Sequence, residues 1–179
     1  MRSTAKHHQN ISKSMDKHSM DKHSSECLGL IMEKICDTGS PVPADVFVQQ
    51  EFGRANLFLG FGEINAIVSP RTHKEVELGT FSGEWRILID NHIYLAGRDA
   101  IDEEEFNVRL HKIKFGAMKS ITMLSAFDVR LTFENGIALD FLCCASDDEV
   151  FHCFLPNNHV ISLEPQEGWV IEWCAKQAQ

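Results

Sequence analysis

Side chains that could bind a metal ion lie close together in the C-terminal part of the chain. Cys143, Cys144, His152 and Cys153 fall on two segments that we predict to be adjacent strands of a hairpin. Zinc takes four ligands in a tetrahedral array, usually from paired short spacings. Because successive side chains of a strand point to opposite faces, only one of the two neighbouring cysteines can approach Cys153. We therefore expect no metal site and no cofactor, and we interpret the six cysteines as reduced, mostly buried thiols.

Nucleotide-binding and nucleophilic motifs are incomplete in this sequence. Gly60-Phe61-Gly62 follows a predicted strand, but a dinucleotide loop also needs a third glycine and a helix behind it, and both are missing. Glycines at a strand end or bulge explain this segment better. The sequence has no G-x-S-x-G elbow, and His92, His111, His152 and His159 fall where ordinary structural roles suffice. Without a convergent acid, base and nucleophile, we expect the protein not to be an enzyme.

Carboxylates form two clusters, one at the start of a predicted helix and one in a predicted turn, and neither has the spacing of a calcium loop. We predict that both are exposed and contact a protein partner, and helix capping and turn solvation are the alternative interpretation. The residues concerned are Asp102, Glu103, Glu104, Glu105, Asp147, Asp148 and Glu149.

The net charge favours a basic partner. The whole chain carries a formal charge of −9, and its first 24 residues carry +3 from five basic and two acidic side chains, which leaves −12 on residues 25–179. An acidic domain repels phosphate backbones, so we expect no nucleic-acid binding. The alternative is that the acidity only keeps the protein in solution.

Residues 1–24 differ in composition from the rest of the chain. This basic segment is rich in His, Lys and Ser, and it repeats Met-Asp-Lys-His-Ser at residues 15–19 and 20–24. It has too little apolar surface to fold, so we predict a disordered leader followed by a single domain over residues 25–179. Its four histidines could bind a transition metal loosely, although an unstructured leader accounts for them. The sequence has no apolar signal-peptide core and no apolar run of membrane-spanning length, so we expect no membrane association and a cytoplasmic protein.

The elements that position these side chains can be read from hydrophobic periodicity. A helix of about 12 residues is predicted with Ser24 or Ser25 as its N-cap and Gly39 as its stop, and residues 102–113 are predicted to form a second helix. Alternating apolar residues predict about ten strands, the last six of them a meander of antiparallel neighbours. Trp169, Ile171 and Trp173 are predicted to seal the core. The predicted fold class is α+β, sheet-dominated, a mostly antiparallel meander with two covering helices.

Two hairpins can be assigned a register. The loop Glu134-Asn135-Gly136, with Gly136 left-handed in a bulge, places Val129 opposite Phe141 and Arg130 opposite Asp140. The alternative two-residue turn would exchange the faces. The segment from Trp85 to Leu95 forms a second hairpin if Asp90-Asn91-His92 is its loop, which sets Ile89 opposite Ile93 and Ile87 opposite Leu95.

From Trp85 onward the order of features resembles a group of small uncharacterised bacterial proteins. The shared features are a Trp-led strand pair, an acidic helix, a strand at Ile121, the run Val129-Arg-Leu-Thr-Phe-Glu-Asn-Gly-Ile-Ala-Leu139 and a late Gly168-Trp169. Some of those proteins are similar to immunity proteins that neutralise contact-dependent or polymorphic toxins. The resemblance covers roughly half of the chain and implies a cytoplasmic inhibitor that blocks a toxin domain, often a basic nuclease.

Three hypotheses of function follow. The first is a non-enzymatic, immunity-type inhibitor that meets a basic toxin domain with acidic side chains. The second is a small-ligand-binding domain or minor enzyme with a pocket between sheet and helices, which could include His92 or His152. The third is an assembly role through an exposed sheet edge. The sequence leaves the oligomeric state open.

Overall fold

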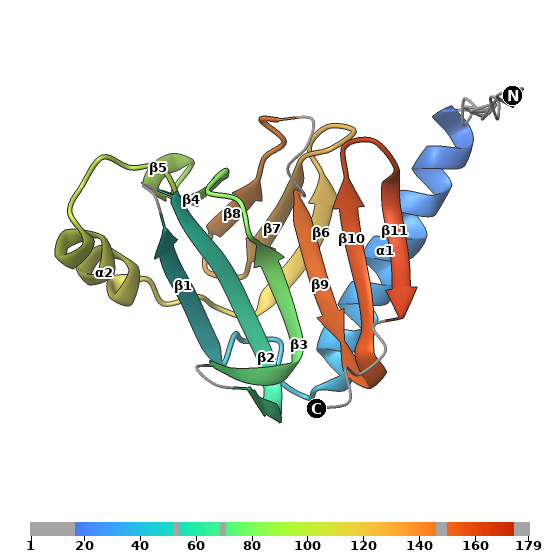
Figure 1. The fold of residues 1–179 in the computed structure, drawn as a ribbon, viewed down its shortest axis with the longest axis horizontal. Helices are drawn as coiled ribbons and strands as arrows, with labels where there is room; N and C mark the ends of the chain where they lie inside the picture. The colour runs from blue at the N-terminus through green and yellow to red at the C-terminus, as the bar shows by residue number, and fades with distance from the viewer. Residues whose placement is uncertain (1–16, 52–53, 69–70, 146–149, 174–179) are drawn as a thin grey trace, which may run out of the picture.

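Two antiparallel sheets build most of the molecule (Figure 1). The computed structural model describes residues 17–51, 54–68, 71–145 and 150–173, and in these residues it has two α-helices and eleven strands. The predicted class, sheet-dominated α+β with antiparallel strands, is therefore confirmed. Within the described residues, no helix is both long and apolar enough to cross a membrane.

The larger sheet has six strands and the smaller one five. The six-stranded sheet runs in the order β1 (Asp45–Glu51), β2 (Arg54–Val68), β3 (Arg71–Thr80), β9 (Phe151–Leu155), β10 (His159–Glu164) and β11 (Gly168–Trp173). The five-stranded sheet runs in the order β5 (His92–Ala96), β4 (Trp85–Ile89), β8 (Ile137–Phe141), β7 (Val129–Phe133) and β6 (Met118–Met123).

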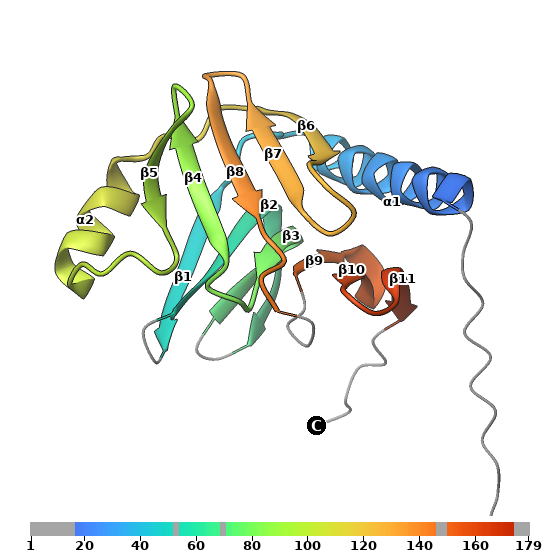
Figure 2. The same cartoon turned by 90° about the horizontal axis from the view of Figure 1, so that it is seen from above.

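The core lies between the two sheets. Alternate residues of the strands, such as Leu57 and Leu59 of β2 and Leu139 of β8, are fully buried there. Trp85 joins the two sheets, because its indole N–H donates a hydrogen bond to the carbonyl of Ala55. Figure 2 shows the sheets as separate layers, with helix α1 beside β6 at their open side.

Helix α1 (Lys17–Asp37) closes this side of the core. It buries Cys27, Ile31 and Ile35, which follow one another at the four-residue spacing of a single helix face. The helix ends at Asp37, and Gly39, the predicted stop, follows it with φ of +73°. Its start was predicted wrongly, because it begins at Lys17 and includes the second copy of the repeat. The remainder of the predicted leader, residues 1–16, lies outside the described residues.

The β7–β8 hairpin has the predicted register. Val129 pairs with Phe141 and Arg130 with Asp140, and Gly136 has φ of +82°. Likewise, the glycines of Gly60-Phe61-Gly62 lie in β2 next to a register shift between β2 and β3, as expected for a bulge.

The β4–β5 hairpin differs from its prediction. Ile87 pairs with Leu95 as expected, but Ile89 pairs with His92, and Ile93 is exposed. The physical reason is that Asp90 and Asn91 both adopt positive φ, at 52° and 62°, and so form a two-residue turn without requiring a left-handed histidine. A register shift in the strand pair absorbs the offset.

The predicted six-strand meander was also wrong, because it is divided between the two sheets. Strands β6, β7 and β8 belong to the five-stranded sheet. After Phe141 the chain crosses to the six-stranded sheet, where it forms β9, β10 and β11. The hairpin that would have joined Cys143 and Cys153 therefore does not form. Trp169 is buried as predicted, whereas Ile171 is 48% exposed. The side chain of Trp173 lies outside the described residues.

Candidate functional site

The acidic residues predicted to bind a partner divide into two groups. Asp102 is the N-cap of α2 (Glu103–Lys112) and accepts a hydrogen bond from the Glu105 backbone N–H at 2.8 Å. Glu105 forms an ion pair with Arg109 one turn later. Glu103 and Glu104 are exposed and line a shallow depression together with Val108. Half of this cluster therefore stabilises the helix, as the alternative interpretation held, and half is available to a partner.

The second predicted acidic cluster cannot be placed, since Asp147, Asp148 and Glu149 lie outside the described residues. Of the histidines considered for a pocket, His92 is the exposed first residue of β5, and its Nδ1 is 2.8 Å from the carbonyl oxygen of Asp90 in the preceding turn. Burial raises the pKa of the Cys153 thiol, and that of Cys27 to about 11, as expected for thiols that serve as core residues. No group of three possible metal ligands occurs among the described residues.

An aromatic cluster lies on the outer face of the six-stranded sheet. Phe58, His152 and Phe154 alternate with core residues along β2 and β9 and so point away from the core, and Phe81, which follows the end of β3, packs against all three. Phe81 is the hub, with ring centroids 4.8 Å from Phe58, 5.0 Å from His152 and 6.4 Å from Phe154. We call these four residues the aromatic face.

Phe81 is exposed although its backbone is firmly held. Its side chain is 53% exposed, whereas Phe58 beneath it is 1% exposed. On either side, Thr80 Oγ1 accepts the Ser82 N–H at 2.9 Å, and Ser82 Oγ accepts the Glu84 N–H at 3.1 Å. These two side-chain turns fix the segment that presents the ring. An exposed phenyl ring on a fixed backbone loses little entropy when a partner covers it.

A glycine shapes the floor of the aromatic face. A Cβ added to Gly79 would lie 2.8 Å from Phe58 Cδ1 and 2.0 Å from the carbonyl oxygen of Leu57. The Phe58 ring can therefore pack against residue 79 only because that residue has no side chain. This packing brings Phe58 within edge-to-face distance of Phe81.

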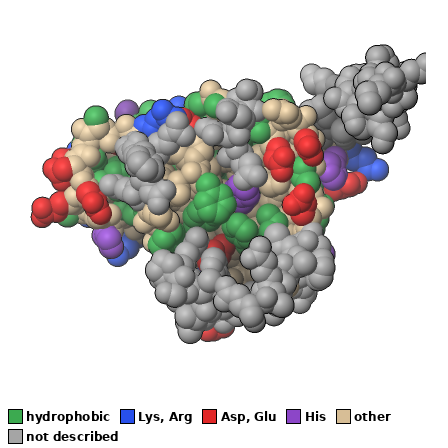
Figure 3. All heavy atoms as spheres, in the orientation of Figure 1, with side chains coloured by type: hydrophobic (Ala, Val, Ile, Leu, Met, Phe, Trp, Pro, Cys, Tyr) green, Lys and Arg blue, Asp and Glu red, His purple; other side chains and the backbone are tan. Residues whose placement is uncertain are grey.

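The aromatic face combines an apolar centre with acidic surroundings. Figure 3 shows the apolar patch next to a histidine, with carboxylates on both sides of it. By strand register, Glu164 of β10 and Glu172 of β11 point to the same face of the sheet as His152, and the acidic start of α2 lies at the far end of the view in Figure 3. Burial lowers the pKa of His152 to about 4, against the opposing effect of Glu164, so this imidazole is neutral at pH 7.

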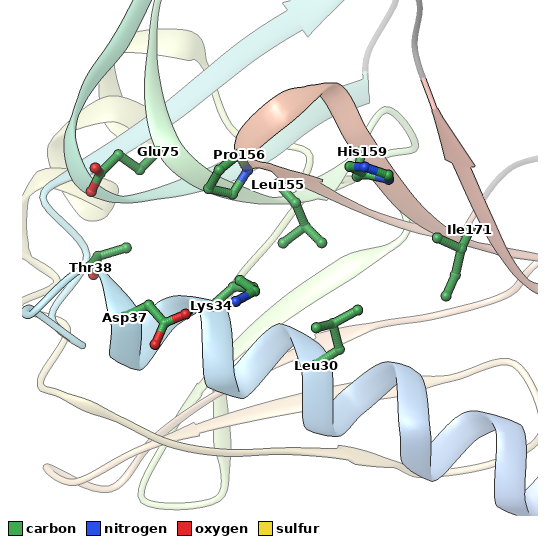
Figure 4. Close-up of a pocket in the computed structure, with 9 residues that line it drawn as sticks. All are labelled: Leu30, Lys34, Asp37, Thr38, Glu75, Leu155, Pro156, His159 and Ile171. Atoms are coloured by element: carbon green, nitrogen blue, oxygen red, sulfur yellow. Dashed lines mark hydrogen bonds and ion pairs between the residues drawn. The ribbon is translucent and has the colours of Figure 1, made fainter.

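A second candidate site is a pocket between α1 and the six-stranded sheet (Figure 4). Its volume is about 440 Å³, which is in the range of small-molecule sites. Its walls come from α1, from β3, from the turn after β9, and from β10 and β11. The lining residues are Leu30, Lys34, Asp37, Thr38, Glu75, Leu155, Pro156, His159 and Ile171. Neither His92 nor His152 is among them.

The outer face of the five-stranded sheet carries a charged clamp. Arg130 of β7 donates to both oxygens of Asp140, at 2.6 and 2.8 Å, and Arg86 of β4 donates to Oδ2 at 2.9 Å. Asp140 is fully buried between the two guanidinium groups. The predicted register pairs Arg130 with Asp140, whereas the burial of the carboxylate and its second partner, Arg86, were not predicted.

The candidate-site residues that sequence reasoning missed are Phe81 and the two phenylalanines next to it. The available signal was the alternation along residues 151–155, which assigns His152 and Phe154 to the face opposite Phe151 and Cys153. Phe81 follows the end of β3, where no periodicity indicates which way a side chain points.

Comparison with known proteins gives no relative from which a function could be transferred. The chain matches no protein-family model, no curated protein and no solved structure. The function must therefore be argued from the two sites themselves.

Proposed function

We propose that this protein is a binding module of the immunity type, which inhibits a basic toxin domain by covering it with the aromatic face. The observation that carries the proposal is the exposed ring of Phe81 on its rigid turn. Aromatic side chains in the centre of an interface supply much of its binding energy, whereas most surrounding contacts contribute little. The partner would insert an apolar group against Phe81 and Phe154.

Charge determines the class of partner. The −12 on residues 25–179 attracts a basic domain, and Glu103, Glu104 and Glu172 are exposed carboxylates available to it. Complementary charge of this kind raises the association rate and restricts the choice of partners more than it raises affinity. In this proposal the aromatic face anchors the complex and the carboxylates steer it.

The experiment begins with the partner. The tagged wild-type protein is used to recover a partner from its own host, and the partner is then produced in pure form. Its affinity is measured for the wild type, for Phe81→Ala and for Ile93→Ala. Ile93 is a matched control because it is also a large apolar side chain, 59% exposed, but lies on the β5 edge of the other sheet.

We expect Phe81→Ala to weaken binding by about thirtyfold, the effect of losing a central aromatic anchor, and Ile93→Ala to leave it unchanged. We also expect the partner to stop bacterial growth when expressed alone, and co-expressed wild type but not Phe81→Ala to restore it. A partner that binds both variants equally well would refute the aromatic face. A partner that binds through it but is harmless to cells would refute the immunity function alone.

Charge-reversal variants test whether the exposed carboxylates raise the rate of association with the partner. Glu103→Lys combined with Glu104→Lys should lower the association rate and its dependence on ionic strength, with a smaller effect on dissociation. Association that is unchanged at low salt would show that these two side chains have no part in the encounter.

A further inference from the structure

The pocket next to α1 has a polar end and an apolar end. In Figure 4, Asp37, Thr38 and Glu75 lie at one end, and the hydrocarbon side chains of Leu30 and Ile171 lie toward the other. Leu155 and Pro156 complete the apolar wall, and the His159 ring lies beside Ile171 at this end. The cavity therefore suits a ligand with a charged or polar head and a hydrocarbon body.

The charge at the polar end is negative. The positive charge of Lys34 is already paired, because its Nζ donates to Asp37 Oδ2 at 2.8 Å and to Glu33 Oε1 at 3.1 Å. These hydrogen bonds raise the pKa of Lys34, so it stays protonated. Among the residues that line the pocket, Asp37 and Glu75 therefore provide two carboxylates against the single ammonium group of Lys34. A cationic head is therefore attracted to this end and an anionic head is repelled.

The Glu75 carboxylate is held in place by the bulge of β2. Its Oε2 accepts a hydrogen bond from the Glu63 backbone N–H at 3.2 Å. A Cβ added to Gly62, which has φ of +77°, would lie 2.2 Å from that oxygen and 2.9 Å from Thr38 Cβ. The glycine thus leaves the space that this carboxylate occupies beside Thr38, and the polar end is fixed by backbone geometry.

We propose that this pocket binds a small organic cation, namely a primary aliphatic amine. Its ammonium group lies between Asp37 and Glu75, and its hydrocarbon body packs on Leu30, Leu155 and Ile171. An ammonium group has three donors, two of which can each bind one of these carboxylates. This site is separate from the aromatic face and does not depend on the function proposed for that face.

The test is a titration of the ¹⁵N-labelled protein followed by amide NMR shifts at pH 7. Hexylamine is the probe, hexanoate has the same body with the opposite charge, and spermidine has charge without a comparable apolar body. We expect hexylamine to give saturable shifts at the amides of Leu30, Thr38 and His159. Hexanoate should leave these amides unshifted, and spermidine should bind more weakly than hexylamine.

Isosteric variants test the carboxylates. Asp37→Asn and Glu75→Gln should each weaken hexylamine binding by about fivefold, as expected for partly exposed ion pairs, and Glu103→Gln on α2 is the matched control. Hexanoate binding at these amides as tightly as hexylamine would overturn the proposal. So would unchanged hexylamine affinity in the folded double variant, or hexylamine shifts confined to residues outside the pocket.

Discussion

Removal of the Asp140 carboxylate should strongly destabilise the fold. Asp140 is 0% exposed and accepts three charge-assisted hydrogen bonds, two from Arg130 and one from Arg86. In Asp140→Asn, one acceptor oxygen is replaced by an amide that faces guanidinium donors, and two partly buried cations lose their counter-charge. Breaking a fully buried pair costs about 3–5 kcal/mol. Because the Arg130 and Arg86 side chains are 27% and 35% exposed, we expect about 2–4 kcal/mol here.

The hydrogen-bond geometry also predicts which of the two arginines contributes more to stability. Arg130→Met removes a bidentate pair and should cost about 2 kcal/mol, whereas Arg86→Met removes one bond and should cost about 1 kcal/mol. The assay is urea unfolding followed by tryptophan fluorescence, with Trp85 as a buried reporter. Glu104→Gln is the exposed control and should change the free energy of unfolding by less than about 0.5 kcal/mol. An equally small effect of Asp140→Asn, or a larger effect of Arg86→Met than of Arg130→Met, would refute this reasoning.

Three further predictions concern other parts of the molecule. Burial lowers the pKa of His152 from 6.5 to about 4 in the folded protein. Above pH 6.5 the imidazole is neutral in both the folded and the unfolded chain, so the full stability is present there. About 3 kcal/mol of this stability should be lost between pH 6.5 and pH 4, and urea titrations at several pH values should show that His152→Phe lacks this dependence. Gly79→Ala should destabilise the protein by about 2 kcal/mol or more because its Cβ has no room, whereas Gly29→Ala, in an open position of α1, should stabilise it by about 0.5–1 kcal/mol. Unfolding temperatures that shift in the same direction for the two variants would contradict this prediction. With iodoacetamide under native conditions, mass spectrometry should find Cys36 alkylated and Cys153 protected until the protein unfolds. Early labelling of Cys153 would contradict its burial.

Local sequence signals predicted local structure well. The register that pairs Arg130 with Asp140 follows from a short loop with glycine at its left-handed position, so it could be derived from adjacent residues. The third member of the clamp, Arg86, comes from β4, which pairs with β8 across a long stretch of intervening chain. No local pattern encodes that pairing, and Arg86 was therefore missed.

The candidate sites depend on tertiary structure in the same way. The pocket exists because Leu30 and Lys34 lie on the flank of α1, one residue before its buried positions, and face the edge strand β11. Ile171 was expected in the core from the alternation of its strand, but β11 ends the sheet and leaves this side chain half exposed beside the pocket. Sequence periodicity gives the face of a strand and does not say what covers that face.

The most direct test of the proposed function is amide hydrogen exchange of the protein alone and in complex with its purified partner. If the aromatic face is the binding surface, the partner should slow exchange in the segment from Thr80 to Glu84 and in β9 near His152 and Phe154. Slowed exchange confined to α1 and the five-stranded sheet, with the Phe81 turn unchanged, would contradict the account.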